Sequence, residues 1–239
     1  MNLTPFRISR RFYRSAILKE FGKPLEIATD SKEPHISQKE VGFELAGEIE
    51  SVGKAVKNFN VGDRVLALKT VSTGAFAEKC AELYKIPHSL SYEMAASLPT
   101  AYGSAYFALN DAAKATEGET VLVVTSQGAS GIATIDLAAN VFRCKVIVAS
   151  DSEEKLEMVR PDGVLATVTY TNKNMVNHVL KSVKDGVDII VDTVGGKWFS
   201  EALKCIKPGG RIISLSFTSG EAPLVDVQSL IKYNASVCG

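Results

Sequence analysis

Residues 120–131 constrain the fold of this chain most strongly, because they predict a buried strand, a tight turn and a helix in direct succession. Val121–Val124 is an unbroken apolar run, the pattern of a parallel strand covered on both faces. The motif Ser126-x-Gly128-x-x-Gly131 then has the spacing of a phosphate-binding turn, with serine in place of the first glycine. Its last glycine lets a helix over Ile132–Asn140 pack closely on the strand, and N–H groups at the start of that helix would bind phosphates.

The rest of the C-terminal half repeats this alternation of strand and helix. Three further apolar strands are predicted, with room for a crossover helix between each and the next: Lys145–Ser150, Asp188–Asp192 and Gly210–Ser216. Small residues occur at strand–helix corners in many α/β proteins, so the turn alone leaves its function open. The repeated alternation predicts an α/β fold with a doubly wound parallel sheet.

Charge and cysteine content argue against several kinds of partner. Lys+Arg and Asp+Glu both number 27, so the formal net charge is zero and gives no general attraction to nucleic acid or to a membrane. The four cysteines form no Cys-x-x-Cys pair, which argues against a zinc ribbon and favours buried, reduced thiols. No apolar run approaches the roughly 20 residues that span a bilayer. We therefore expect neither a nucleic-acid partner nor a membrane partner.

Residues 1–14 carry four arginines, and no acidic residue precedes Glu20. This bias is typical of a mitochondrial transit segment, and a short, disordered basic tail is the alternative. The first interpretation predicts a mitochondrial protein, and the second leaves a cytoplasmic one. A hairpin is predicted next, with strands at Ala16–Leu18 and Leu25–Ile27.

A small β-rich unit is predicted between this hairpin and the parallel sheet. Strands are expected at Gly42–Val52 and Asp63–Leu68, and shorter segments continue the unit to Ile86. Ser91 is the predicted N-cap of a helix. A second helical run, Tyr102–Ala113, leads to the central strand, so we place the domain boundary near residue 110.

The end of the second parallel strand bears on which dinucleotide the turn would hold. Ser150 ends the strand, Asp151 follows it, and Lys155 lies on the next predicted helix. An acid near this position usually binds the free ribose 2′-hydroxyl of NAD. A serine at the strand end with a nearby lysine suits a 2′-phosphate better, since lysine is a compact phosphate partner. A solvated helix position is the alternative for Lys155.

Short motifs follow one another in a fixed order over nearly the whole chain. They are Ala16–Gly22 with Pro24 and Leu25, Gly42–Gly47, Val61–Val65, Gly74–Glu78, Ala95–Pro99 with Tyr102–Tyr106, Ser152–Leu156, Asp192–Gly196 and Lys207–Arg211. In these segments the chain resembles the zinc-free quinone oxidoreductases of the medium-chain dehydrogenase/reductase superfamily, the group that includes zeta-crystallin. The resemblance implies a GroES-like catalytic domain over residues 15–110 and a Rossmann domain over residues 111–239.

The chemistry implied by this resemblance is hydride transfer from NADPH to a quinone or an activated enone, with the cofactor supplying the reactive group. No residue is expected to act as a catalytic acid, base or nucleophile. Zinc-dependent relatives carry a histidine ligand at the position of Phe43 and a cysteine-rich structural zinc lobe, and this sequence has neither feature. We therefore expect no metal site.

The same resemblance implies a set of cofactor-binding residues. The pyrophosphate cradle corresponds to Gln127, Gly128, Ala129, Ser130, Gly131 and Ile132. The 2′-phosphate and adenosine side corresponds to Ser150, Lys155 and Tyr170, and the nicotinamide ribose corresponds to Ser104. Two loops that meet the cofactor hold Thr193, Val194, Phe217 and Thr218. Core packing is the alternative for Val194 and Phe217, and a helix-capping or otherwise satisfied hydroxyl is the alternative for Ser104.

Two departures from the family pattern bear on activity. Only His35–Glu40 stands where the family has a further strand pair and a loop, and the chain stops at Gly239, where the resemblance implies further sheet strands and a return helix. We expect a shortened form, with an incomplete GroES-like domain and a C-terminally truncated Rossmann domain. Its cofactor binding should be weakened and its quinone pocket incomplete.

A competing hypothesis is a non-catalytic dinucleotide-binding or regulatory protein that kept the phosphate cradle and lost the substrate pocket. RNA binding, suggested only by some zeta-crystallin relatives, is disfavoured by the neutral charge balance. The resemblance also implies a homo-oligomer, paired through edge strands of the Rossmann sheet.

Overall fold

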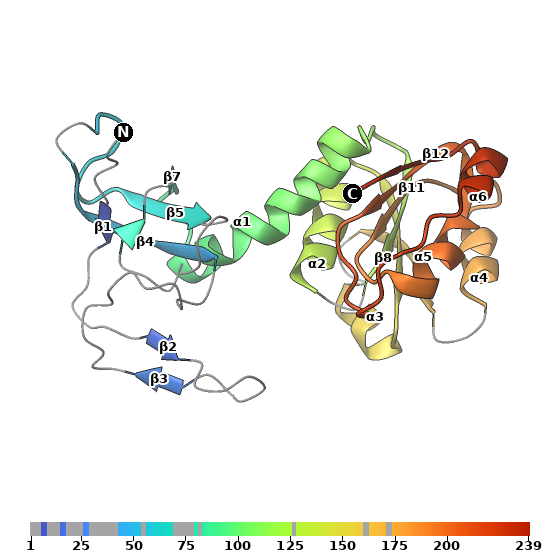
Figure 1. Ribbon diagram of the computed structural model, residues 1–239, viewed down its shortest axis with the longest axis horizontal. Helices are drawn as coiled ribbons and strands as arrows, with labels where there is room; N and C mark the ends of the chain where they lie inside the picture. The colour runs from blue at the N-terminus through green and yellow to red at the C-terminus, as the bar shows by residue number, and fades with distance from the viewer. Residues whose placement is uncertain are drawn as a thin grey trace. The chain divides into compact units, whose positions relative to one another are not determined.

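The computed structural model describes residues 43–53, 56–68, 83–125, 128–159, 163–170 and 174–239, and the backbone of four short strands at 6–8, 15–17, 26–28 and 79–80. Contacts divide the chain into two compact units, which we call unit 1 (Met1–Thr100) and unit 2 (Ala101–Gly239). Each unit has its own sheet (Figure 1). The division falls somewhat before the boundary predicted near residue 110.

Unit 1 is the predicted β-rich unit. β4 (Glu44–Ser51) and β5 (Arg64–Leu68) pair antiparallel at its centre, and their inward side chains bury Ile49 and Val65 completely. Three short strands complete a sheet of order β6-β1-β4-β5-β7. They are β1 (Phe6–Ile8), β6 (Lys79–Cys80) and β7 (Tyr84–Lys85).

A separate pair of strands confirms the predicted hairpin. β2 (Ser15–Ile17) and β3 (Glu26–Ala28) run antiparallel, with Ala16 opposite Ile27. β1 lies within the arginine-rich residues 1–14 and pairs with both β4 and β6. Neither interpretation of those residues included a strand, and a mitochondrial location stays a prediction.

One continuous helix, α1 (Tyr92–Tyr106), replaces the two helical runs predicted from the sequence. Ser91 caps its start, because the serine Oγ accepts the Met94 N–H at 3.2 Å. The helix passes through Pro99, which lacks an N–H group and disturbs the helical hydrogen bonds. There the Glu44 carboxylate accepts the N–H of Thr100 at 2.6 Å, so a side chain satisfies a backbone donor at the disturbance. The helix then continues as a π-helical turn, η1 (Phe107–Ala112).

Unit 2 is built on a six-stranded sheet in which every neighbouring pair is parallel. Its strands are β8 (Thr120–Val124), β9 (Lys145–Ser150), β10 (Val164–Thr169), β11 (Val187–Asp192), β12 (Ile206–Ser214) and β13 (Ser236–Cys238). The spatial order β10-β9-β8-β11-β12-β13 corresponds to the strand order 3-2-1-4-5-6 of dinucleotide-binding sheets. The predicted doubly wound sheet is therefore confirmed.

Helices cover both faces of this sheet (Figure 1). On one face, Val121 and Val123 of β8 pack in a core with residues from η1, α2, its π-helical continuation η2, and α3. On the other face, Leu122 and Val124 pack with residues from α4, α5 and α6. The bounds are α2 (Ala129–Asp136), η2 (Leu137–Val141), α3 (Glu153–Val159), α4 (Met175–Ser182), α5 (Gly196–Leu203) and α6 (Val227–Tyr233). The unbroken apolar runs are thus explained by burial on two sides.

The structure adds one strand that the sequence did not indicate. β10 was not predicted, because it forms an edge of the sheet and only Val168 of its residues is buried, so it lacks the apolar run of an inner strand. At the other edge, β13 pairs with β12 through Arg211 to Ile213 and supplies the sixth strand of the sheet.

A polar network joins the amino-terminal ends of the inner strands. Arg211 donates to both carboxylate oxygens of Glu119, at 2.8 and 3.0 Å, and to the carbonyl of Ala113. Asp188 accepts from the Lys207 ammonium group and from a backbone N–H of β8. Burial raises the pKa of Glu119, but its hydrogen bonds with Arg211 and with a backbone N–H outweigh that effect and leave the pKa below its ordinary value.

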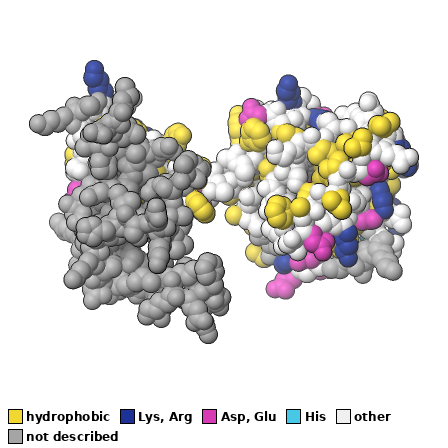
Figure 2. Space-filling model, viewed as in Figure 1, with side chains coloured by type: hydrophobic (Ala, Val, Ile, Leu, Met, Phe, Trp, Pro, Cys, Tyr) yellow, Lys and Arg dark blue, Asp and Glu magenta, His cyan; other side chains and the backbone are white. Residues whose placement is uncertain are grey.

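The surface of unit 2 mixes charges of both signs with apolar side chains. On the face drawn in Figure 2, Lys and Arg side chains alternate with Asp and Glu, and several hydrophobic groups lie between them. Leu224, Val227 and Ile231, in and just before α6, are among its most exposed apolar residues. None of the helices that the structure describes is long and apolar enough to cross a membrane.

Candidate functional site

The predicted phosphate-binding turn joins β8 to α2. Thr125 directly follows the strand, and its N–H donates to the carbonyl of Ala149 on β9 at 2.9 Å. A Cβ added to Gly131 would lie 2.1 Å from Thr125 Oγ1, so only glycine lets the helix approach the strand this closely. Gly128 is different, because a Cβ added there would meet nothing within 4 Å. The first glycine therefore faces open space and the second serves packing, which are the two roles that the spacing predicted.

The remaining cradle residues lie in the first turn of α2. Gly128 is the N-cap of the helix, and Ala129 and Ser130 are its first two residues. Helix geometry leaves the first N–H groups without carbonyl partners inside the helix, so they are suited to an anion. Ile132 is 41% exposed, so its side chain can also contact a ligand. Ser126 and Gln127 lie outside the described residues.

Ser104 lies beside this helix start. Its Oγ donates to the Ala101 carbonyl within α1 and lies 3.5 Å from the Ser130 Oγ of α2. The same two helices are also joined by the Tyr102 hydroxyl, which donates to the Asp136 carboxylate at 2.9 Å. The structure therefore places Ser104 beside the cradle, and its bond to Ala101 agrees with the satisfied-hydroxyl alternative. Its contact with a nicotinamide ribose stays a prediction.

The end of β9 brings three polar groups together. Ser150 is 2% exposed, and its Oγ donates to Asp151 Oδ1 at 3.2 Å. Lys155, in α3, donates its Nζ to Asp151 Oδ2 at 2.7 Å. The two residues assigned to a 2′-phosphate thus share one carboxylate. Asp151 was not among the predicted site residues, although its position directly after a parallel strand could have indicated it.

Tyr170, the third residue assigned to the adenosine side, is almost completely buried. Its N–H donates to the Ser150 carbonyl at 2.9 Å, and its ring lies 4.6 Å from that of Trp198. Burial, followed by the nearby charges of Asp151 and Asp192, raises the pKa of its hydroxyl far above the ordinary value. The side chain is therefore a neutral packing group beneath the end of β9.

The end of β11 is organised by a buried carboxylate. Asp192 is fully buried and accepts the N–H of Val194 at 3.0 Å and that of Gly195 at 3.0 and 3.2 Å. Burial raises its pKa, and these hydrogen bonds partly oppose the shift. Thr193 donates both its N–H and its hydroxyl to the Val124 carbonyl of β8. The loop is thus anchored to the strand that precedes the phosphate-binding turn.

The loop after β12 is tied to the same place. Thr218 donates its N–H and its hydroxyl to the Thr193 carbonyl, at 3.1 and 3.0 Å, and the Ser219 N–H donates to the Val194 carbonyl. Phe217 is 53% exposed, whereas Val194 is 4% exposed. Core packing therefore describes Val194, while Phe217 presents an apolar surface to solvent. Asp192 was missed by the sequence analysis, although an acid between a buried strand and a Gly-Gly turn could have indicated its capping role.

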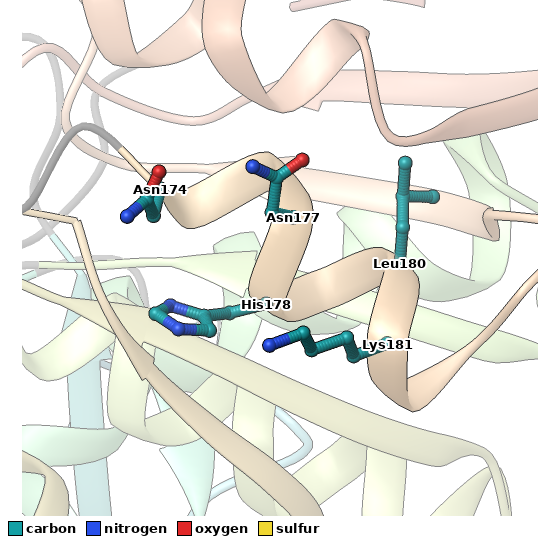
Figure 3. A pocket seen from close by; sticks show the side chains of 5 residues that line it. All are labelled: Asn174, Asn177, His178, Leu180 and Lys181. Atoms are coloured by element: carbon teal, nitrogen blue, oxygen red, sulfur yellow. The ribbon is translucent and has the colours of Figure 1, made fainter.

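A hollow of about 380 Å³ lies elsewhere, on the surface of α4 (Figure 3). Its lining residues are Asn174, Asn177, His178, Leu180 and Lys181. None of them was assigned to the cofactor. The groups at the strand ends, rather than this hollow, therefore form the candidate site. Among the described residues, no cluster of three or more His, Cys, Asp or Glu side chains could hold a metal ion.

Together, the strand order, the glycine turn and the loops at the carboxyl ends of β8, β9, β11 and β12 define a Rossmann-type dinucleotide-binding domain. Family models agree with this class in both units. The model described as the alcohol dehydrogenase GroES-like domain matches residues 25–112, and the one described as zinc-binding dehydrogenase matches residues 129–239.

Sequence similarity to known proteins identifies the family of this chain. The chain is 36% identical over 267 residues to the quinone oxidoreductase-like protein 2 homolog of Nematostella vectensis, covering 96% of this chain and 72% of that protein. It is 37% identical over 203 residues to quinone oxidoreductase-like protein 2 of Bos taurus, covering 83% of this chain and 58% of that protein. The chain is a quinone oxidoreductase-like member of the medium-chain dehydrogenase/reductase superfamily, a family of NAD(P)-dependent reductases.

Solved structures agree on the fold. The crystal structure of Escherichia coli quinone oxidoreductase complexed with NADPH superposes with a TM-score of 0.78 at 20% identity, over 98% of this chain and 72% of that one. The expected GroES-like and Rossmann domains are therefore confirmed. The chain spans less than three fifths of the length of its bovine relative.

Proposed function

We propose that this chain reduces quinones or activated enones by hydride transfer from NADPH. The observation that carries the proposal is the pair of glycines at the β8–α2 turn. Gly131 allows the helix to approach the strand, and Gly128 leaves open space at the N-terminus of that helix. This is the arrangement that a pyrophosphate needs, so the residues present fit a dinucleotide.

Each remaining group has a task that its position permits. NADPH supplies the hydride when it is bound. The N–H groups of Ala129 and Ser130 would hold the pyrophosphate, while Ser150 and Lys155 would face the adenosine ribose. The exposed ring of Phe217 would shield the nicotinamide side from water. We assign no acid, base or nucleophile, and we propose that the reaction is independent of zinc, with Phe43 at the position of the zinc ligand.

A binding and turnover experiment tests the proposal. The full chain is titrated with NADPH by nucleotide fluorescence, and oxidation of NADPH is then followed with and without 1,4-benzoquinone. Binding together with quinone-dependent oxidation supports the proposed reductase. Binding without oxidation supports the non-catalytic dinucleotide-binding protein instead, and absence of binding refutes both.

A charged substitution at the turn makes the test specific for the cradle. Gly128 has φ −67° and ψ 154°, which any residue can adopt, and aspartate is a favourable N-cap. We expect Gly128→Asp to fold but to bind NADPH more weakly than Gly128→Asn by at least about tenfold, because a carboxylate would stand where a phosphate binds. The asparagine variant is the matched control for size. Equal affinities of the two variants would contradict a pyrophosphate at this turn.

The proposed cellular setting follows from the sequence alone. The arginine-rich residues 1–14 support a mitochondrial location, and the family resemblance supports a homo-oligomer. Neutral charge supports a small-molecule partner over nucleic acid.

A further inference from the structure

Asp192 joins the end of β11 both to the turn that follows it and to the end of β12. Its carboxylate is fully buried, and both oxygens accept backbone N–H groups. Oδ1 accepts those of Val194 and Gly195 at 3.0 and 3.2 Å, and Oδ2 accepts that of Gly195 at 3.0 Å. The Asp192 carbonyl accepts the N–H of Leu215, which directly follows β12, at 2.8 Å. One residue therefore fixes the turn after β11 and ties it to the neighbouring strand.

The turn after β11 supports the loop that carries Phe217. A Cβ added to Gly195 would lie 2.6 Å from the Phe217 Cβ and 2.6 Å from the Glu221 carbonyl oxygen, so the loop lies directly on this glycine. The Val194 carbonyl accepts the Ser219 N–H at 3.0 Å. Phe217 is 53% exposed, so its ring is held from below by the turn rather than by surrounding core residues.

Both segments lie in the half of the sheet that would hold the nicotinamide. In a dinucleotide-binding sheet of this strand order, the turn after the central strand holds the pyrophosphate, and the strands on each side of it hold one mononucleotide. β9 and β10 lie on one side of β8, and the residues assigned to the adenosine ribose lie at the end of β9. β11 and β12 lie on the other side, so their loops are left for the nicotinamide nucleotide.

We infer that Asp192 is a positioning residue for the nicotinamide end of the cofactor. It is too deeply buried to touch the cofactor, and it acts by holding the turn on which the Phe217 loop lies. The inference rests on the proposed dinucleotide site and adds the group that aligns its reacting end. Loss of the carboxylate should weaken the hold on the nicotinamide while the pyrophosphate and adenosine contacts remain.

The test compares two ligands that differ only at this end. NADPH contains the nicotinamide, whereas 2′-phospho-ADP-ribose lacks it and keeps the rest of the molecule. In Asp192→Asn, an amide nitrogen replaces one carboxylate oxygen and cannot accept the Gly195 N–H. By isothermal titration calorimetry of the full chain, we expect the dissociation constant of NADPH to rise at least about fivefold, and that of 2′-phospho-ADP-ribose to stay within about twofold of wild type.

Asp188→Asn is the matched control, because it makes the same substitution near the amino-terminal end of the same strand. The Asp188 carboxylate accepts the Thr120 N–H at 2.8 Å and pairs with the Lys207 ammonium group at 3.0 Å, and neither partner is assigned to the cofactor. This variant reports any general effect of losing a carboxylate from β11. It should leave both dissociation constants unchanged.

A double substitution tests the route through the loop. In a Phe217→Ala background, the effect of Asp192→Asn on NADPH should become smaller, because the ring that the turn positions is no longer present. Asp192→Ser provides a second variant if the asparagine variant does not fold, as judged by thermal unfolding without nucleotide. A serine hydroxyl can accept one of the two N–H groups, so the same selective loss is expected.

The outcomes distinguish this inference from the proposed function. Failure of the wild-type chain to bind NADPH refutes the proposed function and the inference with it. Equal weakening of both ligands in the Asp192 variants, weakening of neither, or the same selective loss in Asp188→Asn overturns only the inference. An undiminished effect in the Phe217→Ala background also overturns it, since Asp192 would then not act through this loop.

Discussion

Gly131→Ala should destabilise unit 2, and the two glycines of the turn allow this prediction to be tested against a matched variant. The added methyl group would lie 2.1 Å from Thr125 Oγ1 and 2.7 Å from its Cβ, and Thr125 is 2% exposed, so α2 must move away from β8. Overpacking of this kind costs about 1–3 kcal/mol. Alanine returns up to about 1 kcal/mol through its higher helix propensity. The net loss in the free energy of unfolding should therefore be about 1–2 kcal/mol.

Gly128→Ala is the control, because its methyl group meets nothing within 4 Å. At φ −67° and ψ 154°, alanine is not strained, and the lower conformational entropy of its unfolded chain stabilises the folded protein by about 0.4–1 kcal/mol. Alanine is a poorer N-cap than glycine, and this loss opposes the stabilisation by a similar amount. Its stability should therefore remain within about 0.5 kcal/mol of wild type. Its affinity for a dinucleotide should fall, because the methyl group occupies the approach to the phosphate.

Thermal unfolding without nucleotide, followed by far-ultraviolet circular dichroism, measures the stability difference. We expect the melting temperature of unit 2 to fall by roughly 3–8 °C in Gly131→Ala and by less than about 3 °C in Gly128→Ala. Nucleotide titration of the same samples measures the second effect. The reasoning is refuted if Gly131→Ala melts with wild type, or if the two variants lose stability equally.

Three further predictions concern charged groups outside the turn. Arg211→Lys should cost about 1–3 kcal/mol in urea unfolding, because lysine cannot reproduce the forked contacts with Glu119 and the Ala113 carbonyl; a stability equal to wild type would contradict this role. The raised pKa of Asp192 means that the folded state binds its proton more tightly than the unfolded state, so its contribution is greatest at low pH and is lost as pH rises through the folded pKa. The stability of wild type relative to Asp192→Asn should accordingly decrease as the pH rises above about 4, the ordinary pKa of an aspartate in the unfolded chain. Glu119, whose pKa is lowered, should show the opposite trend against Glu119→Gln, and parallel pH profiles for the two positions would contradict at least one of the two assignments.

Much of the fold was accessible from the sequence because the inner strands of a parallel sheet are buried on both sides. That burial produces unbroken apolar runs, such as Val121–Val124, which are recognised without knowledge of their neighbours. β10 pairs with a neighbouring strand on one side only, and its sequence mixes apolar residues with threonines, so the local pattern did not indicate it. Two separate helical runs were predicted, whereas the structure has one continuous helix through Pro99, where the distant carboxylate of Glu44 accepts the N–H of Thr100.

The candidate site was predictable to the extent that it depends on spacing. Gly128 and Gly131 occupy the positions and conformations that their motif indicates. Contacts between side chains from different elements were not accessible in this way. The shared carboxylate of Asp151 and the burial of Tyr170 beneath β9 depend on how α3 and α5 pack, which no local pattern specifies.

The backbone hydrogen bonds of the loops after β11 and β12 should make local unfolding of this part of the site slow. The amide protons of Thr193, Thr218 and Ser219 are all bonded across to a neighbouring strand or loop. Such protons exchange with solvent only when the bonds break, so this edge should exchange as slowly as the interior of the sheet. A ligand bound there would therefore meet a surface that is already ordered, and its affinity would not be reduced by the entropy of fixing a loop.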